Sequence, residues 1–185
     1  MKKKKVLMLS DHALSTSGVG CQSRFLIEGL LKKGGWSFRQ FGAAVKHVDY
    51  RNVVVNEDFI IKPIDGFGNP DLIRQTLATE KPDLLLIFTD PRFFIWLWEM
   101  EDEIHQICPI VWWHVWDNYP YPYFNRDFYL SNDHIVTISK LTHDIVRTVT
   151  PEVPATYLPH SVDSNIFKPL TDEQIAETRN RSLHE

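Results

Sequence analysis

A glycine-bearing segment near the amino terminus has the composition of an anion-binding turn. Its sequence is Ser-Gly-Val-Gly, and its candidate phosphate ligands are Ser17, Gly18 and Gly20. The segment follows an apolar run at 5–10 and leads into a region of helical character at 20–35. Free N–H groups and the positive end of a helix can face an anion at such a place. A tight turn without a ligand explains the same glycines, and we expect Gly18 to adopt a positive φ there.

A histidine, an acid and an amide follow a second apolar run at 109–114. They are His114, Asp117 and Asn118, and an aromatic loop, YPYPYF, begins directly afterwards at Tyr119. An imidazole with a carboxylate close behind it is typical of a catalytic or binding site, although a lone histidine is also often a hydrogen-bonded structural residue. The tyrosines of the loop offer flat faces and hydroxyl tips on which a sugar or a lipid-linked acceptor could stack. An ordinary loop packed by its own rings is the alternative.

Further polar residues follow the other apolar runs, and some of them suit helix capping equally well. Asp90 could cap the helix that follows it or contact a substrate. Ser139 and Lys140 come at the start of a later helix, where Ser139 is also a suitable cap. His160 and Asp163 lie in a polar stretch near the carboxyl terminus, just after the last apolar run.

All these residues occupy equivalent places in the sequence: each lies just after the carboxyl end of an apolar run or at the start of the helix that follows it. The apolar runs are continuous rather than alternating, which is typical of strands buried on both faces of a parallel sheet. They lie at 5–10, 83–88, 109–114 and 134–139, with a weaker one at 155–160, and alternate with helical segments at 20–35, 69–82, 93–107 and 140–149. A further strand is predicted at 36–42, after the helix stop at Gly34 and Gly35. The sequence therefore predicts a single α/β domain with a doubly wound, mostly parallel, Rossmann-like sheet. In such sheets ligands bind outside the carboxyl ends of the strands.

Composition narrows the class of protein. A chain of 185 residues that is 43% hydrophobic and 24% charged suits one well-buried globular domain, and a net charge of −4 gives no basic face for nucleic acid. The charge run Lys2 to Lys5 is interpreted as a solubilising flank, and no apolar run is long enough for a transmembrane segment. Cys21 and Cys108 show no metal-ligand spacing, so we expect two buried thiols in a cytoplasmic protein without a metal site.

Taken in order, these strand ends resemble the amino-terminal, acceptor-side domain of GT-B glycosyltransferases, specifically the large retaining family four. The turn at 17–20 is similar to that family's glycine-rich turn, His114 and Asp117 to its central His and Asp, and Ser139-Lys140 to the start of a later helix. The most specific match is PHSVDSNIFKP at 159–169, which keeps the Pro, Val, Asp, Phe and final Pro of the family's segment. Departures are Ser17 for the first glycine and His160-Ser161 for Asn-Gly, while 46–68 matches nothing.

The resemblance implies a function and a division of the chain. It implies transfer of a sugar, with retention, from a nucleotide-diphosphate sugar to an unknown acceptor, without a cofactor or bound metal. Residues 17–20 would contact the donor diphosphate and His114 and Asp117 would be catalytic, and the acceptor cleft would be formed by Asp90, Asn118, Tyr119, Ser139, Lys140, His160 and Asp163. Residues 1–170 would form the domain, and 171–185 a charged helical tail leading toward a second GT-B domain that completes the enzyme. The isolated chain would then be inactive, with Phe167 and the tyrosines of the aromatic loop partly exposed.

Two alternatives stay open. The glycine pattern is close to G-x-G-x-x-G, with Ser23 in the last place, so the chain could be a nucleotide- or dinucleotide-binding oxidoreductase domain. Such a domain needs an acid at the end of its second strand, and none occurs here before Asp49. The other alternative is a non-catalytic α/β interaction domain that binds a partner through exposed aromatic residues.

Overall fold

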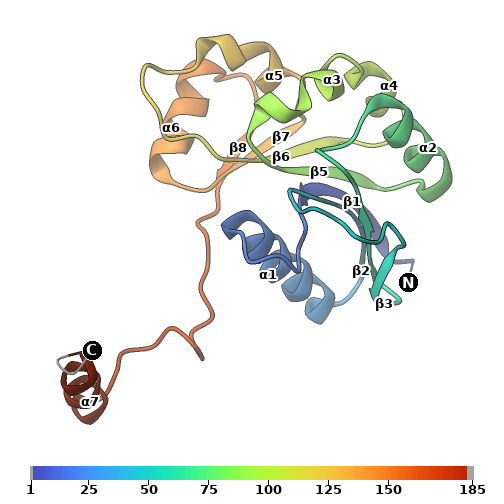
Figure 1. The fold of residues 1–185 in the computed structure, drawn as a ribbon. Coiled ribbons are helices and arrows are strands. Elements are labelled where there is room, and N and C mark those ends of the chain that lie inside the picture. The colour runs from blue at the N-terminus through green and yellow to red at the C-terminus, as the bar shows by residue number, and fades with distance from the viewer. Residues whose placement is uncertain (1, 183–185) are drawn as a thin grey trace.

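The computed structural model describes residues 2–182, which contain one sheet with helices on both of its faces (Figure 1). Neighbouring strands are parallel, except for the antiparallel edge pair β3–β4, and the order across the sheet is β3-β4-β2-β1-β5-β6-β7-β8. The strands are β1 (Lys4–Asp11), β2 (Trp36–Ala43), β3 (Val53–Asn56), β4 (Phe59–Pro63), β5 (Leu84–Thr89), β6 (Ile110–His114), β7 (His134–Thr137) and β8 (Ala155–Tyr157). The predicted Rossmann-like, doubly wound α/β fold is confirmed.

The helices divide between the two faces because the chain reverses direction across the sheet. It moves from β1 to β2 one way and from β4 to β5 and onward the other way, so right-handed crossovers place α1 on one face and the later helices on the opposite face (Figure 1). The α-helices are α1 (Gly18–Lys33), α2 (Pro70–Glu80), α3 (Ile95–Trp98), α4 (Glu101–His105), α5 (Arg126–Leu130), α6 (Lys140–Val149) and α7 (Asp172–Ser182), and the short 3-10 turns are η1 (Pro91–Phe94) and η2 (Tyr123–Asn125). The order reverses between β1 and β5, the position at which such sheets bind ligands.

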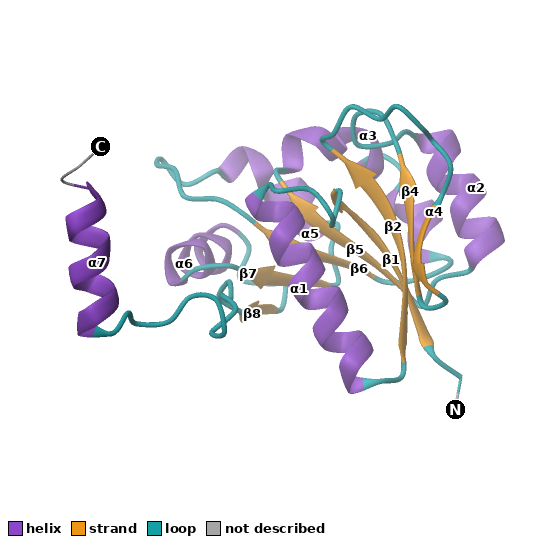
Figure 2. Cartoon of the chain, turned by 60° about the horizontal axis from the view of Figure 1, so that its bottom comes forward, coloured by secondary structure: helices purple, strands orange, loops and turns teal. Residues whose placement is uncertain are grey.

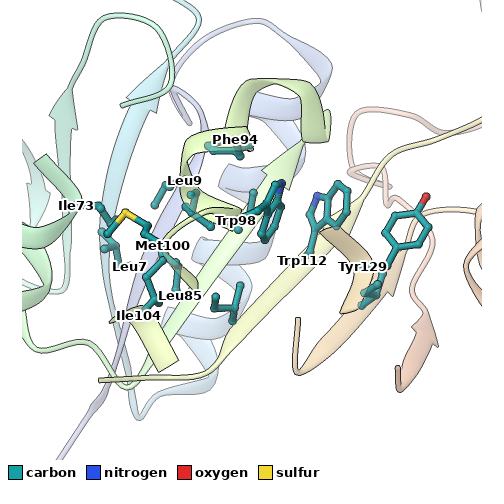
Figure 3. Packing of buried hydrophobic residues seen from close by; sticks show 14 of the residues in the cluster. Leu7, Leu9, Ile73, Leu85, Phe94, Trp98, Met100, Ile104, Trp112 and Tyr129 are labelled. Atoms are coloured by element: carbon teal, nitrogen blue, oxygen red, sulfur yellow. The ribbon is translucent and has the colours of Figure 1, made fainter. Parts of the chain in front are cut away.

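The core consists of two apolar layers, one on each face of the sheet. Along β1, Leu7 and Leu9 belong to the layer under α2 to α6, while Val6 and Met8 belong to the layer under α1. This alternation within a continuous apolar run is what burial on both faces requires. The first layer is the larger and is rich in aromatic rings: Figure 3 shows Trp112 between Trp98 and Tyr129.

Several element boundaries have the local chemistry that the sequence predicts. Asn69 caps α2 by accepting a hydrogen bond from the Leu72 N–H at 2.9 Å, and Pro70 occupies the first helical position. Gly34 and Gly35 follow α1 with φ angles of 83° and 82°, a conformation that strongly favours glycine. These residues end α1 and allow the chain to enter β2 directly.

The structure departs from the predicted elements in three places. Residues 93–107 do not form one helix but η1, α3 and α4, with a break near Met100. The segment 46–68, for which the sequence predicted no element, contains the β3–β4 pair at the sheet edge, and β3 is exposed along its whole length. The last strand is short and ends at Tyr157.

Beyond β8 the chain runs in an extended path to α7, which lies apart from the sheet in both views (Figures 1 and 2). Thr171 and Gln174 form the predicted capping box, in which each accepts a hydrogen bond from the other's backbone N–H. Phe167 is 66% exposed, as expected from the sequence. None of the helices in residues 2–182 combines the length and apolar character needed to cross a bilayer.

Candidate functional site

The turn from β1 to α1 is organised by the hydroxyl of Ser17. This hydroxyl donates to Oδ2 of Asp11 at 2.7 Å and accepts from the N–H of Gly20 at 2.9 Å, which makes Ser17 the N-cap of α1. The hydroxyl of Ser15 lies 3.1 Å from it. Ser17 and the Gly20 amide, both predicted to contact phosphate, are therefore engaged within the turn itself.

The two glycines of the turn have different surroundings. A Cβ on Gly20 would collide with the Ser15 hydroxyl and would lie 2.6 Å from the backbone oxygen of His12, whereas a Cβ on Gly18 would meet nothing within 4 Å. Gly18 begins the helix and has no positive φ, which corrects the expectation from the sequence. Among the described residues the N–H groups of Gly18 and Val19 have no acceptor, as is usual in a first helical turn. These two amides are available to an anion.

Three residues beside this turn were not identified from the sequence. Asp11 ends β1 and places a carboxylate at the amino end of α1, where negative charge is stabilised. His12 and His47 follow β1 and β2, and their ring centroids lie 5.8 Å apart. Burial, and secondarily the neighbouring His47, lowers the pKa of His12, so His12 is a neutral imidazole at neutral pH. The signal that could have found them was their position after the strands, in the segments SDH and AVKH.

His114 lies at the end of β6 but is completely buried, with 0% of its surface exposed. Its Nε2 lies 2.8 Å from the hydroxyl of Tyr129, its ring packs against Trp112 at a centroid distance of 4.1 Å, and Trp116 stacks near it at a centroid distance of 6.4 Å. Its Nδ1 has no hydrogen-bond partner in the described structure. Burial lowers the pKa of His114 to about 3, against the opposing charge of nearby Asp90, so the ring is neutral near pH 7. In this conformation no ligand reaches the ring.

Tyr129 completes this buried pair. Its side chain is enclosed in the larger apolar layer, and burial raises the pKa of its phenol well above the usual value, with a small opposing effect from Asn125. The phenol is therefore protonated throughout the physiological pH range. Figure 3 shows the Tyr129 ring next to that of Trp112.

Asp90 and Ser139 have the capping roles that the sequence offered as alternatives. Asp90 accepts from the Arg92 N–H at 2.9 Å and forms an ion pair with the Arg92 guanidinium at 2.8 Å. Burial raises the pKa of Asp90, but the hydrogen bonds and charge of Arg92 outweigh it, and the net pKa is lowered. Ser139 accepts from the Thr142 N–H at 3.0 Å and caps α6, while Lys140 is exposed.

The segment after β6 is open to solvent. Asp117 is exposed, and the backbone oxygen of Asn118 accepts from the indole N–H of Trp116 at 3.2 Å. Tyr119 is 68% exposed and stacks on Tyr121 at a centroid distance of 5.2 Å. The aromatic loop, residues 119–124, is thus a surface feature with accessible ring faces.

The segment 158–163, called here the strap, runs from β8 along α1. Gln22, in the second turn of α1, donates to the backbone oxygen of Ser161 at 2.7 Å and accepts from the Ser161 N–H at 3.1 Å. The ring of His160 packs edge-on against Phe88 and Trp113, at centroid distances of 5.6 and 5.5 Å, and burial lowers its pKa. The strap therefore brings His160 beside the helix that begins at Gly18.

The predicted site residues thus fall into separate groups. The glycine turn and the strap meet on α1, and His114 lies close to Asp90. The side chains of Asp117 and Lys140 make no hydrogen bond or ion pair with any described residue, and Asp163 bonds only locally, to the Asn165 N–H at 2.8 Å. Within residues 2–182 no cluster of His, Cys, Asp or Glu has a metal-binding arrangement.

Comparison with known proteins assigns no family. The chain matches no protein-family model, and a search of curated proteins finds no significant similarity. The functional interpretation therefore depends on the residues themselves and on the resemblance of their motifs.

The glycine turn gives a matched pair of variants. Gly20→Ala should destabilise the protein by about 1–3 kcal/mol, since its Cβ has no room. Gly18→Ala, two residues away in open space, should leave the free energy of unfolding nearly unchanged. Urea denaturation of both variants measures the difference. Equal stabilities would show that the packed turn does not hold α1 against β1.

Burial of His114 predicts acid sensitivity. Because the pKa is about 3 in the folded state and 6.5 when exposed, the unfolded chain binds a proton that the folded chain does not. The contribution of the neutral His114 ring to the free energy of unfolding is complete above about pH 6.5. This contribution is lost as the pH falls toward 3, by up to about 1.4 kcal/mol per pH unit. His114→Gln should reduce this slope, as measured by urea denaturation between pH 7 and 4. Identical slopes in wild type and His114→Gln would contradict the buried neutral ring.

Proposed function

We propose that the chain is the acceptor-side domain of a GT-B, retaining, nucleotide-sugar-dependent glycosyltransferase. One observation carries the proposal: the two hydrogen bonds between Gln22 and Ser161 hold the most specific matching segment, 159–169, beside the helix that begins with the glycine turn. These segments are far apart in the sequence, yet both flank the carboxyl ends of the central strands. That edge is where a doubly wound sheet binds its ligand.

In this proposal the amides of Gly18 and Val19 bind the diphosphate of the donor. When the bond between the anomeric carbon and the phosphate oxygen breaks, its electron pair leaves with the diphosphate, and negative charge develops there. Unpaired N–H groups at the amino end of α1 stabilise such charge without having to reorganise. Asp11 opposes the binding of an anion, so the proposal requires further positive charge from the second domain.

His114 has a positioning role in this proposal rather than acid–base chemistry. A pKa of about 3 keeps the ring neutral, and its Nε2 is committed to Tyr129, which leaves Nδ1 for a sugar hydroxyl. The segment from Trp116 onward would have to move to expose Nδ1, since the ring is closed off in this conformation. The aromatic loop that follows, with Tyr119 exposed, would then stack against the acceptor.

A dinucleotide-binding oxidoreductase is less well supported. The end of β2 at Ala43 carries no acid that could bind a ribose, and the first acid after it, Asp49, is exposed and paired with Arg51 at 2.6 Å. The glycine turn lacks this second component of a dinucleotide site.

Binding of nucleotide diphosphates tests the role of Gly18. Gly18→Val should weaken the binding of UDP, GDP or their sugars at least tenfold, because its side chain covers amides worth about 1.5–3 kcal/mol each to a charged ligand. Gly29→Val is the matched control, since it lies on the same helix and its Cβ also meets open space. Saturation-transfer NMR suits the weak affinity expected of one domain. Equal signals from both variants would remove the phosphate role, and stronger binding of NAD than of any nucleotide sugar would favour the oxidoreductase.

The division of the site between two domains makes a separate prediction. Incubated with labelled nucleotide sugars and a library of acceptors, the 185-residue chain should give no transfer above background. A labelled glycoside formed by this chain would show that the donor site lies within these residues, contrary to the proposal.

A further inference from the structure

A hollow lies on the face of the sheet covered by α2, between that helix and strands β2 and β4. It has a volume of about 150 Å³, and its charged and hydroxyl-bearing lining residues are Arg39, Lys62, Thr76, Thr79 and Glu80. We call this hollow the α2 pocket. The glycine turn is distant in the fold, since it lies at the carboxyl end of β1 and starts the helix on the opposite face.

The polar lining is unusual for its position in the sheet. Phe41 on β2, which also lines the pocket, and Ile64, the residue after β4, belong to the larger apolar layer. Arg39 lies two residues before Phe41 and Lys62 two residues before Ile64, at alternate positions where the pattern of the strands calls for apolar residues. Such a local violation of the pattern is expected where a residue serves function rather than packing.

Arg39 is partly neutralised by one carboxylate. Its Nε lies 3.3 Å from Glu80, and its Nη1 donates to the backbone oxygen of Phe38 at 3.0 Å. Glu80 is shared, because the ammonium of Lys5 also lies 2.8 Å from it. One carboxylate therefore serves two cations.

Lys62 adds a third cation without a counter-ion. Its side chain is half-buried, and its Nζ lies over the ring of Phe41, 6.0 Å from the centroid. No described acid pairs with it, and no hydrogen bond to it occurs within residues 2–182. Arg39 and Lys62 against Glu80 leave the lining of the pocket with an excess of one positive charge, and Glu80 is also shared with Lys5.

We propose that the α2 pocket binds a small oxyanion such as inorganic phosphate. Arg39 and Lys62 supply the charge, and the exposed amide of Asn52, at the rim, can add a neutral donor. The hydroxyls of Thr76 and Thr79 already donate to the helix carbonyls of Leu72 and Gln75, so they shape the pocket and do not donate. A volume of about 150 Å³ is below that of sites for drug-sized ligands and suits a small anion.

Isothermal titration calorimetry of the 185-residue chain with phosphate, in chloride buffer of constant ionic strength, tests this site. Wild type should bind one phosphate, and Lys62→Gln should weaken binding at least tenfold. Lys168→Gln, an exposed change of equal charge outside the pocket, should have no effect. Parallel titrations with sulfate and with UDP separate a general oxyanion site from a phosphate-specific one and from a nucleotide site.

A second variant does not depend on losing a lysine. Thr79→Asp places a carboxylate in the pocket and should abolish phosphate binding, whereas Thr148→Asp repeats the change on α6, where the hydroxyl likewise donates to a helix carbonyl. The proposal would be overturned if the wild type did not bind phosphate. It would also be overturned if Lys62→Gln and Thr79→Asp bound phosphate as tightly as the wild type does. UDP binding that competes with phosphate here would also overturn it. Gly18→Val should leave phosphate binding unchanged, so failure of the glycosyltransferase proposal would be seen separately.

Discussion

The Ser17 hydroxyl is the interaction on which the carboxyl edge of the sheet depends. It joins Asp11, at the end of β1, to the Gly20 amide in the first turn of α1. Because Gly20 has no room for a side chain, the start of the helix packs directly against the loop that leaves the strand. That arrangement leaves Gly18 in open space and places Gln22, one turn later, where it holds the strap. The unpaired amides at the start of α1 and the strap thus both lie near the topological switch point between β1 and β5.

A cluster of buried aromatic side chains lies next to this edge. The pair of His114 and Tyr129 is buried among tryptophans, and its polar atoms face each other rather than water. Burial on this scale keeps the imidazole neutral and limits it to hydrogen bonding. Two charged groups of the sheet, Arg39 and Lys62, lie instead in the α2 pocket, on the opposite face from α1. The two proposed anion sites therefore differ in kind, one built from backbone amides and the other from side-chain cations.

The sequence predicts what depends on local chemistry and leaves open what depends on distant partners. The continuous apolar runs identify β1, β5, β6 and β7, and Asn69 and the glycines after α1 mark helix ends correctly, because those signals lie within a few residues. Burial of His114 could not be inferred, since Tyr129 comes from a separate helix. The α2 pocket was missed for the same reason: Arg39 and Lys62 become neighbours only through the pairing of β2 with β4. The exposed strand β3 carries no alternation that could have identified it.

The central claim is that the amides of Gly18 and Val19 bind a nucleotide diphosphate, and an NMR titration of the ¹⁵N-labelled chain with UDP tests it most directly. The account predicts concentration-dependent shifts of those two amides and of Ser161 on the strap, with the amides of Lys62 and Thr76 unmoved. Shifts confined to other residues, or none at millimolar UDP, would contradict it.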